Sequence, residues 1–211
     1  MKKRFLVSLI VVCVLLPATL SAAMIDLSIG ATARYDKSFD QIQTSIDEGD
    51  YGDKLMDIEN YAFGADVRFK LLLAEIDLVG MFGSMTSGGV DYTTISILTS
   101  AGISLDILNI ARIGFGMGPR FNVMIDSDGN AVIEDSSGTG VESMDGFGEA
   151  FINSPVAYRA TVDFNLGSMM LGLNYTVDTT YTFKDAEKVQ ELFDADLASG
   201  KVGVSFLFSL F

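Results

Sequence analysis

The chain has no histidine and no tryptophan, and its single cysteine, Cys13, lies in an apolar run near the N-terminus. Zinc sites built from histidine or cysteine, and catalytic Ser-His or Cys-His pairs, are therefore excluded from the rest of the chain. A disulfide framework is excluded for the same reason. The formal charge, 14 − 28 = −14, argues against nucleic acid as a partner because phosphate binding needs a basic surface.

The N-terminal segment has the composition of a secretory signal peptide. Three basic residues at positions 2–4 precede an apolar run, Phe5 to Leu16, and then a segment of small residues that ends at Ala23. A membrane-spanning helix needs about 20 apolar residues, more than this run offers. We expect cleavage after Ala23, so that residues 1–23 are the signal peptide and residues 24–211 form the mature domain. The mature charge is then 11 − 28 = −17.

Eight segments of the mature chain alternate between apolar and polar residues, the period of a strand with one apolar face. About ten residues is the length that a tilted strand needs to cross a bilayer. The alternation is weakest in the third and fourth segments, where Val79, Gly80, Met81 and Leu98 interrupt it. The predicted strands are Ile25–Tyr35, Tyr61–Leu71, Glu75–Gly83, Thr94–Asp106, Ala111–Val123, Val156–Leu166, Leu171–Tyr181 and Lys201–Leu210.

The connections between these segments alternate between short and long. Short turns at one end and long loops at the other, with an even strand count, predict an all-β, antiparallel up-and-down barrel of eight strands. In the fourth long loop, apolar residues at helical spacing predict a short amphipathic helix within Lys184–Leu197. The four long loops are predicted at Asp36–Asn60, Ser84–Thr93, Met124–Ser154 and Thr182–Ser199.

The side chains of the polar face decide between a membrane barrel and a water-soluble one. Many are glycine, serine or threonine, which fit the narrow interior of an eight-stranded barrel, whereas a water-exposed face would carry long lysine and glutamate side chains. The bulky apolar face would then contact lipid. Aromatic residues also sort by depth, as in two interfacial girdles. Tyr35, Tyr61, Tyr92, Tyr158 and Tyr181 lie near the long loops, and Phe69, Phe164, Phe206 and Phe208 near the short turns.

In this arrangement the mature chain resembles the small outer-membrane β-barrels of the OmpA, OmpX and OmpW type, by architecture and without a diagnostic residue motif. The resemblance implies residence in the outer membrane of a diderm bacterium, among outer-membrane lipid. It also implies insertion by the barrel-assembly machinery, which reads an alternating last strand that ends in phenylalanine. Phe211 ends this chain, one step out of phase with the apolar residues of the last strand.

Charges on the polar face balance at seven basic and seven acidic residues, so the loops hold four lysines and 28 − 7 = 21 carboxylates. Unpaired charges inside a narrow barrel are costly, so we expect an interior closed by ion pairs. Lys70 with Glu75, and Asp106 with Arg112, flank short turns and are expected to pair across their hairpins. The candidate interior ion-pair residues are Lys70, Glu75, Asp77, Asp106, Arg112, Arg68, Asp66, Arg120, Arg159 and Asp178.

The third loop offers oxygen ligands of the kind that Ca²⁺ prefers, at Asp126, Asp128, Asn130 and Glu134. Their spacing departs from that of the EF-hand loop. Two interpretations stay open: a weak calcium site that orders the loop, or a solvated acidic surface without a defined site. No other cofactor is expected.

Three functions are compatible with such a barrel. The sequence favours a non-enzymatic outer-membrane protein whose acidic extracellular loops serve surface interaction or envelope integrity, with a cationic partner if any. The alternative is a small, porin-like pore or a carrier of small or hydrophobic solutes, against which the charged, narrow lumen counts. A lipid-modifying or proteolytic barrel enzyme is disfavoured because such enzymes usually need a histidine at the membrane surface, and the chain has none.

Overall fold

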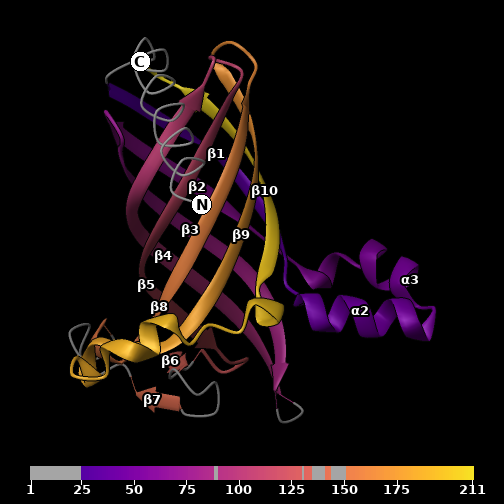
Figure 1. The fold of residues 1–211 in the computed structure, drawn as a ribbon. Coiled ribbons are helices and arrows are strands. Elements are labelled where there is room, and N and C mark those ends of the chain that lie inside the picture. The colour runs from indigo at the N-terminus through magenta and orange to yellow at the C-terminus, as the bar shows by residue number, and fades with distance from the viewer. Residues whose placement is uncertain (1–24, 88–89, 130, 135–140, 144–150) are drawn as a thin grey trace, which may run out of the picture.

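The computed structural model describes residues 25–87, 90–129, 131–134, 141–143 and 151–211, so the predicted signal peptide lies outside the described part. Eight long strands dominate it (Figure 1). They are β1 (Ile25–Tyr35), β2 (Tyr61–Leu71), β3 (Ala74–Ser87), β4 (Val90–Ile107), β5 (Ala111–Ile125), β8 (Pro155–Asn165), β9 (Met169–Thr182) and β10 (Lys201–Ser209). Among the described residues, no helix is long and apolar enough to cross a membrane.

The eight strands form a closed antiparallel barrel. Each pairs with its neighbour along the chain, and β1 pairs with β10, with Ala31 opposite Phe206. This confirms the predicted eight-stranded up-and-down barrel. Short turns lie at one end, at the top of Figure 1, and the long connections lie at the other. Each of the three short turns contains a residue in the left-handed conformation that tight hairpins favour: Leu72 (φ 58°), Asn109 (φ 57°) and Gly167 (φ 80°).

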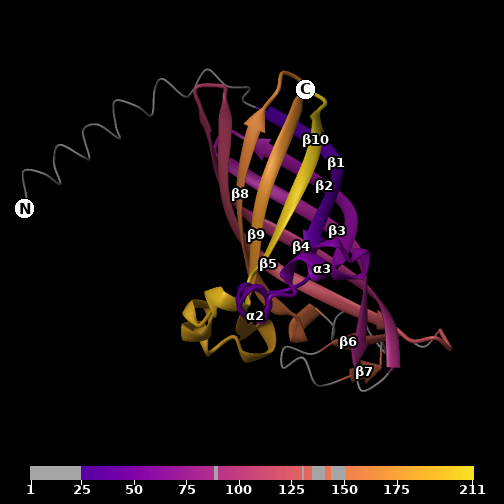
Figure 2. The ribbon, with the colours of Figure 1, turned by 90° about the vertical axis from the view of Figure 1, so that its right-hand side faces the viewer.

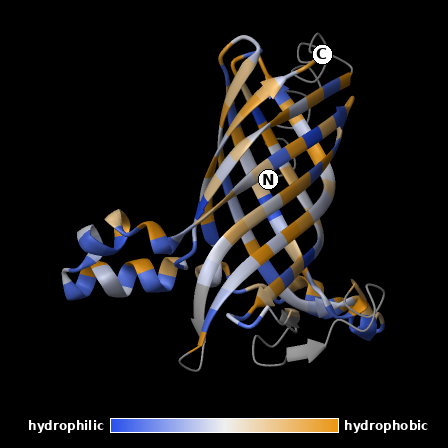
Figure 3. Ribbon diagram, turned by 180° about the vertical axis from the view of Figure 1, so that it is seen from behind, coloured by the Kyte–Doolittle hydropathy of each residue, from blue (hydrophilic) through white to orange (hydrophobic). Residues whose placement is uncertain are grey.

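Hydrophobic and hydrophilic residues alternate along the strands of the barrel wall, as predicted (Figure 3). Bulky apolar side chains point outward and are well exposed, for example 41% for Phe206 and 60% for Phe82. Charged side chains of the other parity point inward, and Asp66 and Asp163 are fully buried. The barrel is therefore apolar outside and polar inside, the reverse of a water-soluble protein.

The residues that interrupt the alternation belong together in the structure. Val79, Met81 and Leu98 point inward and pack with Ala62 and Ala157 in one buried apolar cluster. Along β3, Val79 and Met81 follow the inward-facing Asp77. Three of the four interruptions in the sequence pattern thus belong to one apolar layer across the barrel, which we call the apolar layer.

The first long connection is helical, which the sequence analysis missed. It contains α2 (Phe39–Glu48), α3 (Tyr51–Met56) and the 3₁₀ turn η1 (Ile58–Asn60). The side chain of Ser38 accepts a hydrogen bond from the Gln41 N–H, and the Gln41 side chain accepts one from the Ser38 N–H, a complete capping box. Gly49 (φ 81°) ends α2 in the left-handed conformation. The helix pair projects sideways from the barrel wall (Figure 1).

The second connection corrects a prediction. The segment Ser84–Thr93 was expected to be a long loop, but β3 and β4 continue to pair as far as Ser87 opposite Val90. The ladder persists because threonine-rich sequence on β4 suits a strand even beyond the region of clear apolar alternation. The long extension of β3 and β4 is visible at the lower end of the barrel in Figure 2.

The third and fourth connections also carry local structure. In the third, β6 (Ala131–Glu134) and β7 (Val141–Ser143) form a small hairpin that pairs with the end of β5. The fourth holds the short helix predicted there, but as 3₁₀ turns: η2 (Phe183–Asp185), η3 (Val189–Phe193) and η4 (Leu197–Ser199). The hydroxyls of Tyr158 and Tyr175, on the barrel wall, donate to the carbonyls of Leu192 and Leu197. These bonds occupy carbonyls that a continuous α-helix would use internally.

Two tyrosines of the girdle predicted near the long loops are buried. Tyr35 is 7% exposed and contacts Tyr61 at 5.1 Å between ring centroids, and Tyr181 is 8% exposed and contacts Phe183 at 6.0 Å. These two residues contribute to packing between the barrel rim and its connections, instead of forming part of an exposed ring.

Candidate functional site: the barrel interior and its mouth

A first charge cluster lies inside the barrel near the short turns. The Arg112 guanidinium donates to Asp106 at 2.8 Å and to Asp26 at 2.7 Å. The predicted Asp106–Arg112 pair is therefore present. Lys70 and Glu75 face each other in the β2–β3 register, but the Lys70 ammonium pairs with Asp106, and Glu75 lies 3.8 Å from Arg112. The expected Lys70–Glu75 pair is wrong because the inclined strands bring Asp106 within reach of Lys70.

A second cluster lies deeper in the barrel, and its Arg68, Asp66 and Asp163 side chains are completely buried. The Arg68 guanidinium donates to Asp66 at 2.9 Å and to Asp163 at 2.5 Å. Arg159 donates to Asp66 at 2.6 Å and lies 3.5 Å from Asp77. These contacts connect β2, β3 and β8 across the lumen, so the pairs hold separate parts of the wall together. We call these two groups the turn-end cluster and the central cluster.

The lumen is narrow between the central cluster and the mouth. One hollow lined by Val79, Met81 and Leu98, among others, has a volume of about 10 Å³, and another beside Glu75 and Asp77 has none. A single water molecule needs roughly 10–15 Å³ measured in this way. The first hollow, between the central cluster and the mouth, is therefore no larger than one water molecule, and the second, between the two ion-pair clusters, has no room for one.

A third group of charges lies at the mouth, where the long connections begin. Asp36 accepts from the Arg34 guanidinium at 2.8 Å and from the Lys201 ammonium at 3.3 Å, and Arg120 pairs with Asp178. Burial raises the pKa of Asp36, but the Arg34 and Lys201 cations outweigh burial and hold this pKa below its ordinary value of 3.8. Asp36 is therefore charged and shared between two cations.

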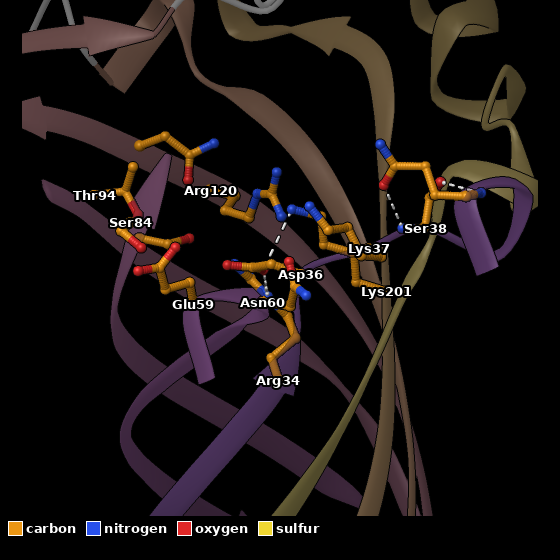
Figure 4. Close-up of a pocket in the computed structure, with 13 residues that line it drawn as sticks. Arg34, Asp36, Lys37, Ser38, Glu59, Asn60, Ser84, Thr94, Arg120 and Lys201 are labelled. Carbon is orange, nitrogen blue, oxygen red and sulfur yellow. Dashed lines mark hydrogen bonds and ion pairs between the residues drawn. The ribbon is translucent and has the colours of Figure 1, made fainter. Parts of the chain in front are cut away.

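Most residues of this group line a cavity of about 610 Å³ at the mouth of the barrel (Figure 4). It is formed by β1, β3, β4, β5 and β10 together with the first long connection. Its lining has four basic side chains, two carboxylates and seven hydroxyl or amide side chains. The basic ones are Arg34, Lys37, Arg120 and Lys201, the carboxylates are Asp36 and Glu59, and the rest are Ser38, Gln41, Asn60, Ser84, Thr94, Ser96 and Asn122.

The structure thus places all ten predicted ion-pair residues among the inward-facing charges of the barrel. Four lie in the turn-end cluster, four in the central cluster and two, Arg120 and Asp178, at the mouth. Four further strand residues, Asp26, Asp163, Arg34 and Lys201, also make ion pairs in the structure, although they are not among the ten predicted residues. Their positions on the polar face of the strands were the signal in the sequence that could have identified them.

The candidate calcium ligands are only partly described. The Asp126 carboxylate accepts from the Asp128 backbone N–H at 2.9 Å, a local turn contact. Asn130 and the side chain of Glu134 lie outside the described residues. Within the described part, no group of three or more carboxylate, cysteine or histidine side chains is arranged to hold a metal ion. The calcium site stays a prediction.

Comparison with known proteins gives no relative: no protein-family model matches the chain, and no curated protein matches it.

Proposed function

We propose that the chain is a non-enzymatic β-barrel of the bacterial outer membrane, similar to the small OmpA, OmpX and OmpW barrels. Its interior is a structural core, and its acidic extracellular connections serve surface interaction or envelope integrity. One observation carries the proposal: a closed barrel with a fully buried ion-pair network inside and bulky apolar side chains exposed outside.

The exposed apolar wall supports a lipid environment. Soluble monomers rarely expose apolar patches larger than a few hundred Å², because apolar surface in water costs roughly 25 cal/mol per Å². Here large apolar side chains such as Ile76, Ile103, Phe115 and Leu173 are each half exposed or more. Such a wall is stable in lipid, where closed barrels also satisfy every backbone hydrogen bond.

The filled lumen favours a structural role for the barrel interior and counts against a pore. Ion pairs fill the turn-end and central clusters, and the apolar layer lies between them and the mouth. An open channel would need a water-filled path past these side chains. The alternative, a small pore or carrier, rests on the mouth cavity alone.

The acidic connections support a role at the cell surface. Residues 36–60 carry eight carboxylates against two lysines, and residues 183–200 carry five against two. A surface with one dominant sign attracts partners of the opposite sign. A cationic protein segment, or divalent cations that bridge to anionic envelope groups, fits this face.

The proposal is tested by expressing the chain with its leader in a diderm host and fractionating the membranes. We expect folded protein in the outer membrane, with gel mobility that changes on heating. In planar bilayers we expect no large, stable conductance steps. Protein recovered from the soluble fraction would contradict the membrane assignment, and stable large steps would favour the pore.

A further inference from the structure

The interior charges balance in total but not locally. Counting strand residues only, the turn-end and central clusters each have two cations and three carboxylates, a sum of −1, whereas the mouth has three cations and one carboxylate, a sum of +2. The mouth is therefore positive in a chain whose total charge is −14. The mouth residues in this count are Arg34, Arg120, Lys201 and Asp178.

The connection residues around the mouth cavity do not remove this excess. The lining has four cations against two carboxylates, and Asp178, which pairs with Arg120, adds a third carboxylate, so the sum is +1. One of the carboxylates, Asp36, is already shared between Arg34 and Lys201. Lys37 lines the cavity and makes no ion pair with any described residue, and the buried Nε of Arg120 has no hydrogen-bond partner in the same part of the chain. Donor capacity is left over for an added anion.

The rest of the lining sets the character of the ligand. The volume of about 610 Å³ lies within the range of roughly 300–1,000 Å³ typical of small-molecule sites. Such sites are usually lined by apolar side chains, but this lining has none. Seven hydroxyl and amide side chains offer donors and acceptors together, as a ligand with several hydroxyl groups requires. The N-terminus of α2 at Ser38 adds the positive end of a helix dipole.

We propose that the mouth cavity binds a small phosphorylated sugar. The phosphate is held by Arg34, Lys37 and Arg120, since guanidinium groups bind phosphate through paired hydrogen bonds. The sugar hydroxyls contact the serine, threonine and amide side chains of the wall. This inference goes beyond the proposed function and needs only the folded barrel, whether or not the chain resides in the outer membrane.

The same headgroup chemistry could come from a free sugar phosphate or from a phosphorylated sugar on a lipid. The position of the cavity favours the free molecule. It opens inside the ring of strands, and its lining is polar, so acyl chains attached to the ligand would have to leave the lipid and cross the rim. The apolar outer face of the barrel is separated from the cavity by the strands themselves.

The test is calorimetric titration of the mature protein in detergent micelles at low salt, with glucose 6-phosphate as the probe. We expect saturable binding that weakens as salt is added, because salt screens the exposed cations. Glucose should not bind, and inorganic phosphate should bind about tenfold more weakly than the sugar phosphate, since it lacks the hydroxyl contacts. Absence of saturable binding by glucose 6-phosphate would overturn the proposal, and equal binding of inorganic phosphate would overturn the assignment of a sugar.

Two lysine variants distinguish binding in the cavity from nonspecific attraction of the ligand to positive charge. Lys37→Gln removes a cavity cation and should weaken binding of glucose 6-phosphate by about tenfold. Lys188→Gln makes the same charge change on an exposed lysine that pairs with Asp185 and does not line the cavity, and it should leave binding within about twofold. Heat-modifiable mobility checks that both variants are folded. Equal weakening by both variants would overturn the cavity as the site.

A competition experiment with a lipid distinguishes a free sugar phosphate from a phosphorylated sugar on a lipid. A phosphorylated glucosamine lipid is added to the micelles, and the titration with glucose 6-phosphate is repeated. We expect unchanged binding of the soluble probe. Competition by the lipid would overturn the assignment to a soluble ligand.

Discussion

Arg68 on β2 and Asp163 on β8 are 95 residues apart in the chain, yet their side chains are 2.5 Å apart in the middle of the barrel. Neither side chain has exposed surface. Because β2 and β8 are not neighbours in the sheet, this ion pair crosses the lumen and ties opposite walls together. It is the contact in the central cluster that joins opposite walls of the barrel.

Replacement of Arg68 by methionine should destabilise the barrel strongly. Asp66 and Asp163 would lose a shared cation while staying buried, which typically costs about 3–5 kcal/mol. Urea unfolding in micelles, followed by heat-modifiable mobility, measures the loss. Lys188→Met, on an exposed lysine, is the control and should change stability by less than about 1 kcal/mol. Equal stability of the two variants would show that the buried pair does not hold the walls.

Gly64 and Gly80 offer a matched pair on adjacent strands. A Cβ atom at Gly64 would overlap the backbone carbonyl of Gly80, whereas a Cβ atom at Gly80 would meet nothing within 4 Å. Gly64→Ala should therefore prevent or greatly slow refolding, because β2 and β3 would have to separate. Gly80→Ala should refold like the parent chain. The folded fraction on unheated gels reports both, and normal refolding of the Gly64 variant would contradict the close approach.

Truncation of the apolar layer should cost more than truncation of the outer wall. Leu98 is 4% exposed within the layer, and Leu98→Ala should lower the free energy of unfolding by about 2–5 kcal/mol, since it leaves a cavity. The adjacent Ile97 faces outward and is 38% exposed. Ile97→Ala should cost less because detergent fills the space. The two unfolding midpoints in urea decide the comparison, and a larger loss for the Ile97 variant would contradict it.

Acid should loosen the mouth through Asp36. The pKa of this carboxyl is depressed in the folded protein by Arg34 and Lys201, despite its burial. Its stabilising contribution is therefore fully present above the ordinary value of 3.8 and is lost as the pH falls through the lower folded pKa. Hydrogen exchange of residues 36–60 should rise in that window. Asp36→Asn should remove this component of the pH dependence, and an unchanged profile would contradict the assignment.

The strands were predictable because one rule governs most positions: inward side chains, in the crowded lumen, are mostly small, polar or charged, and outward side chains are mostly bulky and apolar. The same rule placed every candidate charge inside. The rule did not predict the ion-pair partner of each charge. The inclination of the strands decides that Lys70 pairs with Asp106 and not with Glu75. Hairpin register alone carries no information on contacts between strands that are not adjacent.

The helices and the mouth cavity were harder to predict for different reasons. Ser38 and Gln41, followed by Gly49, are a readable start and stop signal for α2, but the acidic composition of this segment resembled a solvated loop. The mouth cavity combines Arg34, Arg120 and Lys201 from three strands with the first connection. No local pattern in the sequence brings these residues together.

The apolar layer of Ala62, Val79, Met81, Leu98 and Ala157 has a consequence for how the protein can diverge. It separates the two ion-pair clusters from the charges of the mouth, and among the described residues no ion pair joins the mouth to either cluster. The two parts of the interior therefore share packing but no polar contact. A chimera that carries the mouth and connections of another eight-stranded barrel should keep the two ion-pair clusters intact if these five positions keep their volume.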